Sequence, residues 1–214
     1  MPAELIARLL DSNATWASDV SHAEPTFFPE STKGQSPKML WIGCADSRVP
    51  ESVVVACKPG DIFVHRNIAN QFHPKDDNVL SVLTYAVEAL NIDHIVVVGH
   101  TYCGGATHCW NNAGAAPVSP SLASDPLTRW LGPLTILARQ QQSGPDATDA
   151  EKAIRALIEK NVELQVLNVA RTSIVRDAWK KGRDIHVYGW VYELENGRLR
   201  DLEVSISREN ALPM

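Results

Sequence analysis

The residues of this chain that could do the most chemistry lie in two short segments, Cys44-Ala-Asp46-Ser-Arg48 and His100-Thr-Tyr-Cys103. Two thiolates and one imidazole are ligands that zinc prefers, and three protein ligands leave the fourth tetrahedral position to water. Structural zinc sites usually fill all four positions with protein. The pattern therefore predicts a catalytic site with one zinc ion per chain, in a hydrolase or a hydratase.

Asp46 has two alternative roles in such a site. It can occupy the fourth zinc position and block it, or it can pair with Arg48 and accept a hydrogen bond from a bound hydroxide. A bidentate arginine–carboxylate pair is strong enough to hold the second arrangement. Zinc lowers the pKa of bound water to about 7, so the hydroxide is available near neutral pH to attack an electrophilic carbon. The residues leave both arrangements open, and a change between them would act as a pH switch.

The composition is that of one globular domain. The chain has 214 residues, 44% of them hydrophobic, and a formal net charge of -5. We expect a single domain over residues 1–214, with an arm and connector (1–35), a metal-site core (36–110), and helices with a terminal hairpin (111–214). No basic patch favours nucleic acid, and no apolar run approaches the roughly 18 residues of a membrane span. The first residues lack the features of a secretion signal, so we expect a cytoplasmic protein with reduced cysteines.

Apolar runs and turn signals predict how these residues are positioned. Buried strands are expected over 38–43, ending at Cys44, and over 94–99, ending at His100. The other expected elements are an amphipathic helix in residues 1–20, a strand over 62–65, a helix capped by Asp76 or Asp77, a helix from Gly104, a loop over 111–126, two or three helices over 127–180, and a hairpin of 185–194 with 199–205.

Strands that alternate with helices indicate an α/β fold with a mainly parallel central sheet and helices on both faces. In such sheets ligands bind beyond the carboxyl ends of the strands. Both chemical segments follow directly after a predicted strand. If these strands are neighbours, the two segments meet at one edge of the sheet.

Three segments in the same order resemble the beta-class carbonic anhydrases. Residues 41–50, 60–70 and 99–105 read WIGCADSRVP, GDIFVHRNIAN and GHTYCGG. The later helices and the hairpin with Trp190-Val-Tyr192 are also similar to that family. The resemblance implies a zinc lyase that hydrates carbon dioxide reversibly to bicarbonate and a proton, by attack of zinc-bound hydroxide.

The resemblance also implies roles for individual residues. Cys44, His100 and Cys103 are the zinc ligands by this match. Asp46 and Arg48 form the dyad that gates and orients the fourth zinc position, and Asp46 is itself a ligand only in a closed state.

Further matches concern the substrate. Gln35 corresponds to a hydrogen-bond donor to the substrate, and Phe63, Ile68 and Tyr85 correspond to the wall of an apolar pocket. An apolar wall suits a neutral molecule such as carbon dioxide. Gly104 can bring a backbone N–H close to the site, because it has no side chain.

The family assembles as a homodimer or a dimer of dimers, in which an amino-terminal helical arm embraces the partner. The helix expected in residues 1–20 fits that arm. Trp41, Arg66 and Tyr192 match positions that form a separate bicarbonate site in an allosteric subgroup, a further hypothesis for this chain.

Two other functions remain as alternatives. The same fold and metal could act on carbonyl sulfide or carbon disulfide, with access to the pocket deciding the substrate. A zinc-stabilised binding or redox-sensing module without turnover is the other alternative. Asp46 and Arg48 argue against that module, because a structural site needs no gate.

Overall fold

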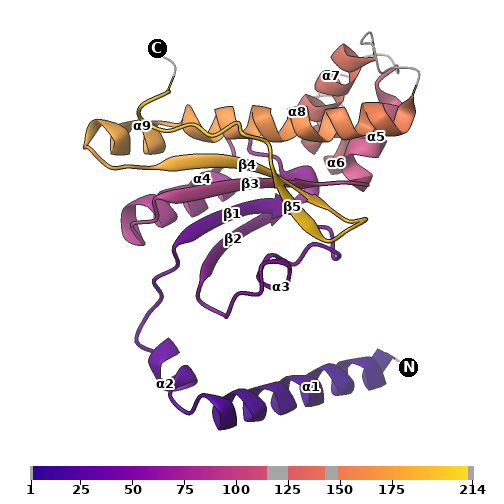
Figure 1. Cartoon of the computed structure of the whole chain (residues 1–214). Coiled ribbons are helices and arrows are strands. Elements are labelled where there is room, and N and C mark those ends of the chain that lie inside the picture. The colour runs from indigo at the N-terminus through magenta and orange to yellow at the C-terminus, as the bar shows by residue number, and fades with distance from the viewer. Residues whose placement is uncertain (1, 115–124, 143–148, 212–214) are drawn as a thin grey trace. The chain divides into compact units, whose positions relative to one another are not determined.

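The computed structural model describes residues 2–114, 125–142 and 149–211 (Figure 1). The chain divides into two compact units, Met1–Ser36 and Pro37–Met214. The first unit contains helices α1 (Pro2–Ala23) and α2 (Phe27–Ser31). The helix expected in residues 1–20 is therefore present. Its large apolar side chains are exposed in the single chain: Leu5, Ile6, Leu9, Leu10 and Trp16.

The second unit is built on a five-stranded sheet with the order β2-β1-β3-β4-β5. The first four strands in this order are parallel, and β5 is antiparallel to β4. The predicted mainly parallel sheet and terminal hairpin are therefore confirmed. The strands are β1 (Met39–Cys44), β2 (Ile62–Asn67), β3 (His94–His100), β4 (His186–Glu193) and β5 (Arg198–Asp201).

Strands β1 and β3 are nearly continuous apolar runs and are buried along almost their whole length. Such runs are typical of parallel strands that are covered on both faces. The two strands pair directly, with Gly43 opposite Val98. Cys44 and His100 therefore end at the same edge of the sheet.

Helices surround the sheet, but the cover of its two faces is unequal. The larger core packs one face, which carries Leu40 and Ile95, against α4, α5, α7, α8 and α9. On the other face Trp41 and Val96 belong to a smaller cluster, to which α3 contributes Val54. Figure 1 shows α8 and α3 on opposite sides of the sheet. The helices are α3 (Glu51–Val54), α4 (Asp77–Thr84), α5 (Gly104–Asn112), α6 (Pro126–Trp130), α7 (Gly132–Gln141), α8 (Ala150–Ala170) and α9 (Ser173–Lys180), with a 3-10 turn η1 (Ile68–Asn70) and a π-helical turn η2 (Tyr85–Ala89).

Several local signals act as expected, and one prediction is wrong. The Asp76 side chain caps α4 by accepting a hydrogen bond from the Asn78 backbone N–H. The described residues between 126 and 180 form four helices rather than two or three. The extra break lies where Leu131 ends α6, and Pro133 at the start of α7 lacks the N–H that a continuous helix would use. Of the loop expected over 111–126, residues 115–124 lie outside the described part.

The long helix α8 is attached to the sheet edge that carries the predicted ligands by a buried polar network. The Asn161 side chain donates to the Ala69 carbonyl at 3.0 Å and accepts from the Gln71 amide at 2.7 Å. The Gln165 side chain accepts from the Phe72 backbone N–H at 3.0 Å. Since Ala69 adopts a left-handed φ of 62°, these bonds hold a loop conformation that the chain alone would disfavour.

Two strand glycines allow α8 to lie close to the sheet. A Cβ atom on Gly99 would lie 2.7 Å from Val162 Cγ2. On Gly189 it would lie 2.7 Å from Val204 Cγ2 and 2.9 Å from Val162 Cγ1. Both positions therefore require glycine for packing. No helix in the described ranges is long and apolar enough to cross a bilayer.

Gly189→Ala should destabilise the fold, because the added methyl group overpacks the contact between β4 and α8. We expect a loss of about 1–3 kcal/mol in the free energy of unfolding, measured by urea denaturation. Gly114→Ala is the control, since a Cβ there would meet nothing within 4 Å. Equal stability of the two variants would contradict the packing argument.

Candidate metal centre

The predicted ligands meet at the carboxyl edge of the sheet. Cys44 is the last residue of β1, His100 is the last residue of β3, and Cys103 caps the amino terminus of α5. One ligand atom of each residue lies within 4.8 Å of the other two, and all three residues are buried. The structure therefore brings together the three residues that the sequence pattern selected.

A sharp turn lets His100 and Cys103 face the same point. Between them Tyr102 adopts a left-handed φ of 55°, which is uncommon for a residue with a large side chain. This conformation reverses the chain before α5 begins at Gly104. Such strain persists where the surrounding structure holds it and is concentrated at functional sites.

The His100 ring is oriented as a metal ligand would be. Its Nδ1 lies 2.9 Å from the Thr101 carbonyl oxygen, which can only accept, so Nδ1 carries the proton and Nε2 presents its lone pair. Nε2 is buried and has no hydrogen-bond partner among the described residues. A buried nitrogen without a partner is costly. Together with two neighbouring sulfur atoms, it fits a zinc ion.

In the metal-free protein the two neighbouring thiols shift each other's pKa in opposite directions. Hydrogen bonding from the Cys103 thiol lowers the pKa of Cys44, and the same contact, together with burial, raises the pKa of Cys103. Burial opposes the charged form of His100, but the adjacent Cys44 thiolate, the Thr101 carbonyl and the Asp46 carboxylate together more than offset this and raise the pKa of His100. A metal must displace these protons, so binding should weaken in acid.

Asp46 and Arg48 form a two-point pair beside the cluster. Arg48 Nε donates to Asp46 Oδ1 at 2.9 Å, Nη2 donates to Oδ2 at 2.7 Å, and the Arg48 backbone N–H donates to Oδ1 at 2.9 Å. These bonds hold the pKa of Asp46 well below its usual range. Asp46 Oδ2 also lies 3.8 Å from His100 Nε2, so the carboxylate borders the cluster.

Backbone carbonyl groups around the site are held by arginine side chains. Arg66 donates from Nε to the Cys44 carbonyl at 2.8 Å and from Nη2 to the Asp46 carbonyl at 2.5 Å. Arg48 Nη2 also donates to the Tyr102 carbonyl at 3.3 Å. Both segments of the site are therefore fixed through their main chain.

Two of the predicted substrate residues, Ile68 and Gly104, lie near the cluster. Ile68 is 43% exposed and lines a cavity of about 480 Å³ together with Ala45, the residue after Cys44. Gly104 directly follows Cys103, and a Cβ added to it would meet no atom within 4 Å. The next glycine is more restricted, because a Cβ on Gly105 would lie 3.0 Å from the Ala69 Cβ.

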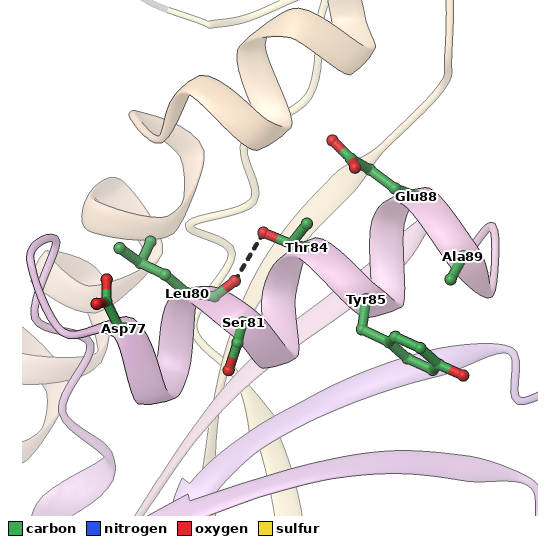
Figure 2. A pocket seen from close by; sticks show the side chains of 7 residues that line it. All are labelled: Asp77, Leu80, Ser81, Thr84, Tyr85, Glu88 and Ala89. Carbon is green, nitrogen blue, oxygen red and sulfur yellow. Dashed lines mark hydrogen bonds between the residues drawn. The ribbon is translucent and has the colours of Figure 1, made fainter.

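Phe63 and Tyr85 lie elsewhere. Their rings stack with centroids 5.8 Å apart. Asn67 of β2 pairs with Cys44 of β1. Phe63 lies four residues before Asn67, which is roughly 13 Å away along the strand. Tyr85 lines a hollow formed by residues of α4 and η2, and Figure 2 shows it projecting from the opposite side of the helix to Glu88. The structure does not bring these two rings to the metal cluster of their own chain.

The roles predicted for the remaining residues stay predictions. Gln35 belongs to the first compact unit. Trp41 is buried, the Arg66 guanidinium is bonded to main-chain carbonyls, and Tyr192 packs in the same small cluster as Trp41.

The residues that hold the turn between His100 and Cys103 were not predicted from the sequence. The Thr101 hydroxyl donates to Glu195 Oε2 at 2.7 Å, and Arg155 lies over the Tyr102 ring. The Thr101 hydrogen bond, together with a hydrogen bond to the Glu195 backbone and the Arg155 guanidinium, lowers the pKa of Glu195 to about 2. An Asn-Gly turn signal marked the hairpin that carries Glu195, but no sequence pattern connects positions 94 residues apart.

The chain was compared with known protein families and structures. A family model described as carbonic anhydrase matches residues 39–199. A carbonic anhydrase of Emericella nidulans is 35% identical over 198 residues, which cover 92% of this chain and 83% of that protein. A carbonic anhydrase of Saccharomyces cerevisiae is 32% identical over 195 residues, which cover 90% of this chain and 86% of that protein.

Solved structures give the same result. A beta-carbonic anhydrase of Sordaria macrospora, described as tetrameric, superposes with a TM-score of 0.84 at 35% identity, covering 95% of this chain and 99% of that chain. A beta-carbonic anhydrase of Aspergillus fumigatus superposes with a TM-score of 0.82 at 34% identity, covering 95% and 93%. The chain belongs to the carbonic anhydrase family of enzymes, in its beta class.

Cys103→Ser should abolish tight zinc binding while keeping the side-chain volume. We expect affinity to fall by at least about 100-fold, since loss of a partner outside the ligand shell already costs 10–100-fold. Chelator competition with metal analysis measures this loss. Cys57→Ser, at a partly exposed thiol outside the cluster, is the matched control. A zinc-loaded Cys103→Ser protein would show that the cluster is wrongly assigned.

Arg48→Met should change the acid stability of the metal-free protein. A carboxyl group with a depressed pKa stabilises the native state above its unfolded pKa, about 4, and this stabilisation is lost as the pH falls further. The unfolding free energy of the wild type should therefore decrease more steeply below about pH 4 than that of Arg48→Met. Urea denaturation at several pH values, with the exposed Arg198→Met as control, measures the difference. Parallel curves would contradict the depressed pKa of Asp46.

Proposed function

We propose that this protein hydrates carbon dioxide reversibly to bicarbonate and a proton, with one zinc ion per chain held by Cys44, His100 and Cys103. The observation that carries the proposal is the buried cluster of three ligand atoms within 4.8 Å of one another, bordered by the ionised Asp46. When bound, zinc supplies a Lewis acid that lowers the pKa of water to about 7. The surrounding residues orient the reactants.

Asp46 is the proposed acceptor that orients the attacking water. Its carboxylate is charged at neutral pH, and it lies beside His100 Nε2. Three N–H groups of Arg48 hold the carboxylate in this position. Movement of Asp46 into the fourth ligand position would leave the Arg48 guanidinium without this pair. The arrangement therefore favours an open site, and the closed state is a less stable alternative.

The surroundings of the cluster suit a small neutral substrate. The exposed Ile68 side chain provides an apolar surface, and the space in front of Gly104 is open. Phe63 on β2 lies too far along its strand to line the same pocket within one chain, and Tyr85 of η2 stacks on Phe63. Their predicted pocket role therefore requires a second copy.

This requirement supports a homo-oligomer, either a dimer or a dimer of dimers. The exposed apolar side chains of α1 and the tetrameric assembly of the Sordaria relative agree with it. We also propose a cytoplasmic location, which the four free cysteines support.

Stopped-flow hydration of carbon dioxide with a pH indicator tests the activity. We expect catalysis that depends on zinc and is inhibited by acetazolamide, because a structurally similar beta-carbonic anhydrase of Coccomyxa forms a complex with this compound. Zinc-loaded protein that hydrolyses carbonyl sulfide or carbon disulfide but not carbon dioxide would support the alternative substrates. Zinc-loaded protein without any turnover would support the non-catalytic module.

Asp46→Asn should keep zinc but lose turnover, because an amide is a weaker acceptor than a carboxylate. We expect kcat to fall by about 10²–10⁴-fold, as for loss of a proton-handling group. Metal analysis and stopped-flow assays on the same sample separate the two effects. Asp177→Asn, an exposed carboxylate paired with Lys180, is the control. A metal-free Asp46→Asn protein would instead make Asp46 a structural ligand.

A further inference from the structure

We propose that Glu195, in the turn between β4 and β5, is a positioning residue for the metal ligand His100. It acts through Thr101, and Arg155 of α8 supports it. The inference rests on the proposed zinc site. Glu195 and Arg155 lie outside the motifs that suggested the site. Thr101 lies within one of them, but no role was predicted for it.

Thr101 is held entirely by the hairpin. Its backbone N–H donates to the Tyr192 carbonyl at 3.0 Å. Its hydroxyl donates to Glu195 Oε2 at 2.7 Å and accepts from the Leu194 backbone N–H at 2.9 Å. The residue is 3% exposed, so water does not compete for these bonds. Because the hydroxyl both donates and accepts, the orientation of Thr101 is fixed.

The carbonyl group of Thr101 sets the orientation of the ligand. It lies 2.9 Å from His100 Nδ1, and this bond determines which nitrogen faces the two thiols. A hydrogen bond to the second nitrogen of a ligating histidine orients the ring, and loss of such a partner costs 10–100-fold in metal affinity or activity. Thr101 is therefore the single residue that connects Glu195 to the His100 ring.

Arg155 connects Glu195 to Tyr102, the residue that follows Thr101 in the turn. Its Nη2 lies 2.6 Å from Glu195 Oε1, and its guanidinium carbon lies 5.4 Å from the centroid of the Tyr102 ring. The Tyr102 carbonyl in turn accepts from Arg48, the partner of Asp46. The carboxylate of Glu195 thus holds Thr101 directly and Tyr102 through Arg155. These are the two residues between the ligands His100 and Cys103.

A second hairpin carboxylate provides a matched control. Glu193 pairs with Arg200 at 3.1 Å and accepts from the Asn196 side chain at 2.6 Å. It therefore has the same chemistry as Glu195 and lies in the same hairpin, but its partners are other hairpin residues. Exposed ion pairs contribute little to stability. An effect of Glu195 on the metal that Glu193 lacks would have to come from the contacts of Glu195 with Thr101 and Arg155.

The experiment compares the full-length variants Glu195→Gln, Thr101→Val, Thr101→Ser and Glu193→Gln. Three measurements are made: the zinc dissociation rate in chelator competition, the visible spectrum of the cobalt(II)-substituted protein, and kcat and KM for carbon dioxide. We expect Glu195→Gln and Thr101→Val to release zinc roughly tenfold faster, to shift the cobalt bands, and to lower kcat more than they raise KM. Thr101→Ser keeps the hydroxyl and should restore wild-type values, and Glu193→Gln should match the wild type.

The proposal is overturned if Glu195→Gln and Thr101→Val lose thermal stability but keep the zinc dissociation rate and cobalt spectrum of the wild type. In that case the contact would be merely structural. The Glu195 side chain is 33% exposed, so Glu195→Gln decides the matter if Thr101→Val does not fold. Absence of carbon dioxide hydration by the wild type would reject the proposed function. The zinc and cobalt measurements would still test the positioning role.

Discussion

The parallel pairing of β1 with β3 is the constraint on which the metal centre depends. Two strands separated by about fifty residues end at one edge, so a thiol and an imidazole meet without a long ordered loop. A shift of register by one residue would turn Cys44 to the opposite face of the sheet. The glycine on β3 that receives α8 makes such a shift unfavourable, because a side chain would take the place of Gly99 against Val162.

Around this pairing, the polar groups form a shell that fixes the backbone of both ligand segments. Arg66 and Arg48 hold carbonyl groups, while the hairpin and α8 hold Thr101 and Tyr102. The left-handed backbone at Tyr102 is stable only because these contacts surround it. Ligand geometry in this enzyme is therefore a property of several elements rather than of the two motifs alone.

The sequence alone was sufficient to predict the strands that end at Cys44 and His100, because short apolar runs rich in β-branched residues are typical of buried strands. It was also sufficient to select the three residues that the structure brings together as a possible metal site, whose residue types carry their own chemistry. It was not sufficient where distance along the chain or along a strand decides. Phe63 lies in the same motif as Ile68, which lines the cavity beside Ala45, yet its register places it far from Cys44 of the same chain. The contact of Thr101 with Glu195 depends on how the hairpin closes, which no local pattern encodes.

The helix α8 contacts three features near this edge: Arg155 reaches the turn, Asn161 holds the loop at Ala69, and Val162 packs on Gly99. Opening of this helix would therefore release the turn between His100 and Cys103 and the loop at Ala69 at once. A ligand that binds only the closed protein suppresses such opening in proportion to its own binding free energy. Amide hydrogen exchange in α8 should accordingly be slower when the metal centre is occupied than when it is empty, although α8 contains none of the predicted ligands.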